Sequence, residues 1–180
     1  MSRILRGRVW KYGDNVDTDV IFPGRHTYTA RSREDIASHA LEDLDPRFAT
    51  GVRPGDIVAG GRNWGCGSSR EQAVTTLLYN GVSVVLAAGF SRIFYRNAVN
   101  QGMWALIAPD AVDMLHDGDL AEVDLELGTV RILEPSSTAE REIERVAAFE
   151  APPANMRAVI EAGGLVPFVA ASLEPEVDHV

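Results

Sequence analysis

The pattern of apolar and polar residues in the middle of the chain alternates between short apolar runs and longer amphipathic segments. Apolar runs at 57–59, 82–88 and 104–108 are separated by helix-like segments at about 69–80 and 91–100. Asn80-Gly81, after the first of these segments, is a typical helix stop. The alternation predicts an α/β core whose strands pair in parallel.

The segments on either side of this core predict further elements. Each shows either alternation of apolar and polar residues or a helix signal, such as the capping-box spacing that begins at Ser32. The acidic tail from about residue 173 to residue 180 is expected to be frayed. The expected elements are a strand over 4–12, a helix from about 32 to 44, a hairpin of 120–125 with 129–133, and a last helix between 153 and 163.

Composition and charge limit the classes of function. A chain of 180 residues is long enough for one domain with a buried core. No stretch is apolar for long enough to span a bilayer, and the basic N-terminus continues into a charged strand instead of a secretory core. We therefore expect a cytoplasmic protein without a membrane partner. The net charge of −9 argues against nucleic acid as a partner, and the single cysteine, Cys66, cannot alone hold an iron–sulfur cluster or a cysteine-rich zinc site.

The segment 63–73, NWGCGSSREQA, is the most informative part of the chain. A glycine-rich turn that opens a helix presents free backbone N–H groups and the positive end of the helix dipole, which suits an anion. Ser68 and Ser69 could instead cap the helix, since each has capping-box spacing to a residue three positions later. Capping explains one serine but not the second. It also does not explain Arg70, which the helix dipole disfavours unless an anion compensates its charge.

Other interpretations of these motifs stay open. A phosphate-binding P-loop is disfavoured because its Gly-Lys-Ser/Thr ending is absent. Cys66 could serve as a nucleophile, but no histidine lies near it in sequence and a packing role is favoured. Asp17 and Asp19 are interpreted as turn residues, with Asp19 a candidate partner for a neighbouring cation. Arg92 and Arg96 fit a solvated basic helix face and an anion site or interface equally well.

Three segments, in the same order, resemble the small subunit of 3-isopropylmalate dehydratase, the swivel domain of the aconitase superfamily. They are KYGDNVDTDVI at 11–21, GCGSSREQA at 65–73 and SRIFYRNA at 91–98. The resemblance runs from about residue 7 to residue 168. It implies an α/β fold, namely an aconitase-like swivelling β/β/α domain with a mixed sheet, and a single swivel domain over 1–180.

The resemblance also implies chemistry. Members of this family are the small subunit of a heteromeric hydro-lyase that dehydrates and rehydrates 2-hydroxy di- or tricarboxylates. In leucine biosynthesis the enzyme isomerises 2-isopropylmalate and 3-isopropylmalate. A [4Fe-4S] cluster is carried by the partner large subunit, so none is expected to be bound by this chain and activity is expected only with that partner.

Site residues follow from the resemblance by position. Ser68 is the expected catalytic base, which requires backbone N–H donors and a nearby cation to stabilise its alkoxide. Arg70 is expected to pair with a substrate carboxylate, and Ser69 and Asp19 are expected to contact the substrate or support the turn. The loop 25–31 is the expected substrate-specificity loop, with the candidates Arg25, His26, Thr27 and Tyr28.

The loop also leaves the substrate open. Its residues are less apolar than we expect for a loop that contacts an isopropyl group, so homoaconitate, citraconate and dimethylmaleate are alternative substrates. A non-catalytic module that binds carboxylates is the alternative function.

Overall fold

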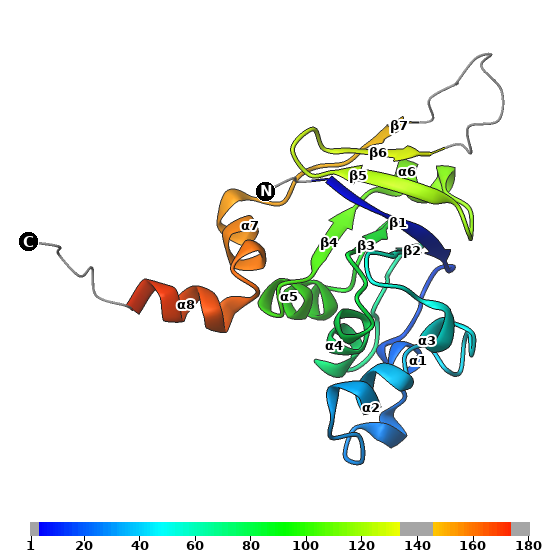
Figure 1. Ribbon diagram of the computed structural model, residues 1–180, viewed down its shortest axis with the longest axis vertical. Helices are drawn as coiled ribbons and strands as arrows, with labels where there is room; N and C mark the ends of the chain where they lie inside the picture. Colours follow the sequence, from blue (N-terminus) through cyan, green and yellow to red (C-terminus); the bar gives the residue numbers. More distant parts are fainter. Residues whose placement is uncertain (1–3, 134–145, 174–180) are drawn as a thin grey trace, which may run out of the picture.

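A seven-stranded mixed sheet organises the fold, with the strand order β4-β3-β2-β1-β5-β6-β7 (Figure 1). The computed structural model describes residues 4–133 and 146–173, so most of the tail expected to be frayed, residues 174–180, lies outside the described residues. Strands β1 to β4 pair in parallel, whereas β1 pairs with β5, β5 with β6 and β6 with β7 antiparallel. The predicted α/β class and mixed sheet are confirmed. The strands are β1 (Ile4–Lys11), β2 (Ile57–Gly60), β3 (Val84–Ala87), β4 (Trp104–Ile107), β5 (Leu120–Asp124), β6 (Thr129–Ile132) and β7 (Val146–Ala148).

Helices cover both faces of the parallel half of the sheet. The crossovers from β2 to β3 and from β3 to β4 run through α4 (Gln72–Tyr79) and α5 (Arg92–Asn100), which lie side by side on one face (Figure 1). Val58 and Val85 point into the core on that face, while their neighbours along the strands point into the core beneath α6 (Pro109–Met114). This alternation is what a strand with both faces buried requires.

The remaining helices flank the sheet. Helix α8 projects away from the sheet in Figure 1, and none of its residues is buried. No single helix in the described ranges is long and apolar enough to cross a membrane; α7 and α8 reach that length and composition only as a pair, bent by 91° at their junction. The helices that flank the sheet are α1 (Thr18–Ile21), the 3₁₀ helix η1 (Gly24–His26), α2 (Arg33–Ser38), α3 (Phe48–Gly51), α7 (Ala154–Glu161) and α8 (Leu165–Leu173).

The helix expected over about 32–44 begins as predicted but ends early. Ser32 caps α2, because its hydroxyl accepts the N–H of Asp35 at 3.0 Å. The helix stops at Ser38, and Leu41 has a φ of +56°, so the chain turns. The N–H of Leu41 donates to the carbonyl oxygen of Ile21 at 2.9 Å, which ties this turn back to α1. A long-range hydrogen bond therefore takes precedence over local helix propensity.

A buried carboxylate fixes the start of β2 against β1. Asp56 is 5% exposed and accepts three hydrogen bonds: from the indole Nε1 of Trp10 at 2.9 Å, and from the backbone N–H groups of Arg8 at 3.2 Å and Arg53 at 3.0 Å. The Trp10 ring in turn packs edge-on against Phe48, with ring centroids 5.1 Å apart. The carboxylate thus joins the central strand pair to the core beneath α3.

Replacing Asp56 with alanine is expected to lower the free energy of unfolding by about 3 kcal/mol, because its donors, including a buried indole N–H, lose their acceptor. Chemical denaturation followed by tryptophan fluorescence measures the change. Asp113→Ala, on the exposed side of α6 and without a hydrogen bond within the described ranges, is the matched control and should change stability little. Equal stability of the two variants would contradict the assigned role.

Candidate active site

The loops that follow β1 and β2 run side by side beyond the ends of their strands. Backbone hydrogen bonds continue the parallel pairing of the two strands into these loops. Both loops leave the sheet at the carboxyl ends of parallel strands, which is where open α/β sheets bind their ligands. The bonds run from the N–H of Tyr12 to the oxygen of Ala59 (2.8 Å), Gly61 to Gly13 (2.9 Å), Asn15 to Arg62 (2.8 Å), Gly65 to Val16 (2.8 Å) and Thr18 to Cys66 (2.7 Å).

Glycines on either side of Cys66 are needed for the turn that follows. Gly65 has a φ of +71° and Gly67 a φ of +97°, a region that side chains rarely adopt. A Cβ on Gly65 would collide with the ring of Phe94, and a Cβ on Gly67 would collide with the carboxylate of Asp17. The turn is therefore pressed between α5 and the loop after β1.

The serines do not cap α4, so the capping interpretation is wrong. The helix begins at Gln72 and not at Ser69, and Glu71 precedes it without a side-chain cap. The hydroxyl of Thr18 donates to the carbonyl oxygen of Ser68 at 3.0 Å, which ties the turn to α1. Ser68 and Ser69 consequently lie exposed in the turn that precedes the helix.

This turn presents unused donors. Within the described part of the chain, the backbone N–H groups of Gly67, Ser68 and Ser69 donate to no other atom. Successive free N–H groups in a turn with left-handed glycines form a concavity that suits an anion, and α4 adds its N-terminal dipole. The half-buried Cys66 contributes its backbone carbonyl oxygen to the pairing of the loops.

Arg70 and Asp19 lie together at the edge of this turn. Nη1 of Arg70 is 2.5 Å from Oδ1 of Asp19, without the alignment of a hydrogen bond, and the guanidinium has no other partner among residues 4–133 and 146–173. Asp19 also accepts the N–H of Gly24 at 3.2 Å, and Asp17 accepts the N–H of Asp19 at 2.7 Å. Asp17 thus acts as the predicted turn residue, capping α1, and Asp19 is the partner of a cation.

The loop 25–31 begins directly beside Arg70. A Cβ on Gly24 would collide with the Arg70 guanidinium and would lie 2.8 Å from Oδ1 of Asp19. The candidates at 25–28 do not share one orientation. The side chain of Tyr28 is 89% exposed, whereas Thr27 is half-buried and donates its N–H to the carbonyl oxygen of Gly24 at 3.2 Å.

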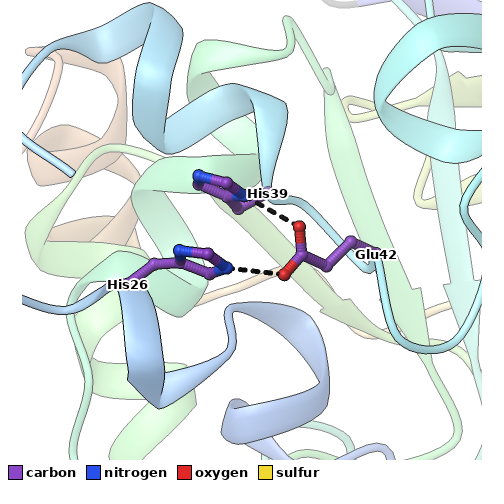
Figure 2. Close-up of side chains that lie close together, drawn as sticks. All are labelled: His26, His39 and Glu42. Atoms are coloured by element: carbon purple, nitrogen blue, oxygen red, sulfur yellow. Dashed lines mark hydrogen bonds and ion pairs between the residues drawn. The ribbon is translucent and has the colours of Figure 1, made fainter. Parts of the chain in front are cut away.

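Arg25 and His26 are held by acidic residues that follow α2. Figure 2 shows His26 and His39 pointing at the two oxygens of Glu42, with Nε2 of His26 2.7 Å from Oε1 and Nδ1 of His39 2.8 Å from Oε2. Arg25 contacts the same Glu42 and also Asp43. Burial opposes ionisation of Glu42, but the hydrogen bonds from His39 and His26 outweigh it and hold the pKa of Glu42 below its ordinary value.

Sequence reasoning missed Glu42, Asp43 and His39. The available signal was an adjacent pair of acids, Glu42-Asp43, placed after a loop that carries Arg25 and His26 but no acid of its own. Arg92 and Arg96, by contrast, lie on the exposed face of α5 and form no ion pair in the part of the chain that the structure describes. A solvated face and an interface both remain compatible with this arrangement.

Comparisons with known proteins identify the family of the chain. Residues 43–111 match the sequence profile described as the aconitase C-terminal domain. The 3-isopropylmalate dehydratase small subunit of Halothermothrix orenii is 46% identical, covering 90% of this chain and 93% of that protein. The methanogen homoaconitase small subunit of Methanothermobacter thermautotrophicus is also 46% identical, covering 92% of this chain and 91% of that protein.

A solved structure gives the same result. The crystal structure of 3-isopropylmalate dehydratase from Methanocaldococcus jannaschii superposes with a TM-score of 0.84 at 40% identity, covering 94% of this chain and 95% of that one. Both the motifs and the fold therefore agree with the resemblance. The chain belongs to the family of 3-isopropylmalate dehydratase small subunits within the aconitase superfamily.

Proposed function

We propose that this chain is the small subunit of a heteromeric hydro-lyase that isomerises 2-isopropylmalate and 3-isopropylmalate by dehydration and rehydration. The observation that carries the proposal is the exposed Ser68 hydroxyl in a turn with free backbone N–H groups, next to an arginine. That arrangement suits proton removal from a carbon beside a carboxylate. The family relationship supports the same reaction class.

Each part of the turn has a role in this proposal. Oγ of Ser68 takes the proton from the carbon next to a substrate carboxylate during dehydration and returns it during rehydration. The free N–H groups at 67–69 and the start of α4 stabilise the alkoxide that this requires. Arg70 binds the substrate carboxylate with its guanidinium, and Ser69 contributes a further hydrogen bond.

The chain does not fit an iron–sulfur cluster of its own. Such a cluster takes several thiolate ligands, and the sequence contains one cysteine. We therefore place the [4Fe-4S] cluster on a large subunit, where it would act as a Lewis acid on the substrate hydroxyl. In this proposal the chain acts as a single swivel domain, in the cytoplasm, and completes a site whose other half belongs to that partner.

A homoaconitase small subunit is the second candidate. The Methanothermobacter relative of that name is as similar to this chain as the Halothermothrix relative, at 46% identity. The two substrate classes differ at the substituent of the malate unit, which is uncharged in one and ends in a third carboxylate in the other.

Ser68→Ala is expected to reduce kcat of the complex with a large subunit about a thousandfold, because a positioned base contributes roughly 10²–10⁴ in rate. Steady-state turnover of 3-isopropylmalate measures the loss. Cys66→Ala, in the same turn, is the matched control and should retain most of the activity. Near-normal turnover by Ser68→Ala would remove the assigned base, and inactivity of Cys66→Ala would favour thiol chemistry.

Arg70→Lys keeps the positive charge but removes the planar pair of donors. We expect kcat/KM to fall about 10- to 100-fold, since hydrogen bonds between charged groups contribute roughly 1.5–3 kcal/mol. The measurement is initial-rate kinetics with the reconstituted complex, after circular dichroism has verified the fold. An unchanged kcat/KM would show that Arg70 does not bind the substrate carboxylate.

A further inference from the structure

Arg25 and His26, at the start of the specificity loop, are both engaged by carboxylates from outside the loop. Arg25 meets Asp43 in a two-pronged ion pair, with Nη1 2.7 Å from Oδ2 and Nη2 2.8 Å from Oδ1. Its Nη2 also contacts Oε1 of Glu42, the oxygen that lies 2.7 Å from Nε2 of His26. Two carboxylates thus engage one guanidinium and one imidazole.

His39 makes this arrangement rigid. Its ring stacks on that of His26, with centroids 3.5 Å apart and planes 8° from parallel, and its Nδ1 is 2.8 Å from the second oxygen of Glu42 (Figure 2). The buried ring of Phe22 packs edge-on against both imidazoles. Glu42 is therefore fixed on both of its oxygens and cannot rotate without breaking the contacts of both histidines.

A metal ion would compete with this network. Ligand atoms of His26, His39 and Glu42 lie within 4.8 Å of one another, a spacing that a metal ion can use. The Arg25 guanidinium, however, already contacts the Glu42 oxygen that His26 uses. A metal ion would have to displace that cation, so the contacts favour a charge-neutralising network.

The network lies next to the place where the substrate carboxylate is proposed to bind. Gly24 packs against Arg70 and Asp19, and Arg25 is the next residue. A malate unit held by Arg70 would direct its substituent toward the loop residues that follow. Of the candidates there, Thr27 and Tyr28 carry no charge. The charge of Arg25 is met by Glu42 and Asp43, and His26 is held by Glu42.

We propose that Glu42 and Asp43 are specificity-determining residues: they hold Arg25 and His26 and neutralise the charge of Arg25, so that the loop accepts an uncharged substituent and rejects a third carboxylate. This inference rests on the proposed function, because it requires that the loop faces the substituent. In this proposal Glu42 and Asp43 separate the two substrate classes by charge and not by the size of the subsite.

The test uses the complex of the full chain with a large subunit and two substrates that differ only in the substituent. These are 3-isopropylmalate and 3-(2-carboxyethyl)malate, and the readout is the ratio of their kcat/KM values. The wild-type complex should prefer 3-isopropylmalate. The double variant Glu42→Gln, Asp43→Asn leaves the Arg25 charge unbalanced, and the preference for 3-isopropylmalate should fall at least tenfold.

Further variants separate charge from folding. Adding Arg25→Gln to the double variant should reverse the gain on the tricarboxylate, because the uncovered cation is removed. Asp43→Asn alone, at an exposed position, should shift the ratio less but in the same direction. Arg53→Ala is the matched control: this exposed arginine lies outside the loop 25–31, its guanidinium forms no ion pair within the described residues, and its loss should leave the ratio unchanged.

The outcomes that overturn the inference are distinct. An equal loss of kcat/KM on both substrates would mean that the two acids only stabilise the loop, and a wild-type preference for the tricarboxylate would contradict the inference directly. A wild-type complex that turns over neither substrate would overturn the proposed function together with this inference.

Discussion

The backbone pairing between the loops after β1 and β2 is the interaction on which the site depends. Its hydrogen bonds bring Thr18 against Cys66 and Ser68, although these residues are far apart in sequence. The pairing holds the turn at 65–69 in place before α4. The requirement for glycine at 65 and 67 follows from the same close approach.

Charge at the site is arranged in pairs drawn from different segments. Arg70 meets Asp19, which lies in α1, and Arg25 meets Glu42 and Asp43, which follow α2. An acidic chain can thereby hold arginines close together without leaving their charges unbalanced. The consequence is a site in which guanidinium geometry, and not excess positive charge, would select the ligand.

Local signals were sufficient to predict the central strands and the two crossover helices. Runs such as 57–60 and 84–87 are apolar throughout because both of their faces are buried, and the capping residues Ser32 and Ser91 mark helix starts. The short helices α3 and α6, strand β7 and the exposed helix α8 were not predicted, since they are too brief or too uniformly apolar to show a period. The predicted start of α4, at about residue 69, was too early, since the helix begins at Gln72.

For the site, the family resemblance predicted that Ser68, Ser69, Arg70 and Asp19 lie in one site, and the structure brings Arg70 and Asp19 into contact. The role of Glu42 was not predictable, because it depends on the turn at Leu41 that carries the chain back toward α1. Hydrogen bonds between distant segments leave no periodic trace in a sequence.

The ion pair of Arg70 with Asp19 also bears on how the site would respond to its surroundings. When a ligand carboxylate replaces Asp19 as the partner of Arg70, the side chain of Asp19, which is 50% exposed, regains its hydration. The Arg70 guanidinium has one ion-pair partner before this exchange and one after it. Binding at Arg70 would therefore vary little with ionic strength, unlike the capture of an anion by a bare cation.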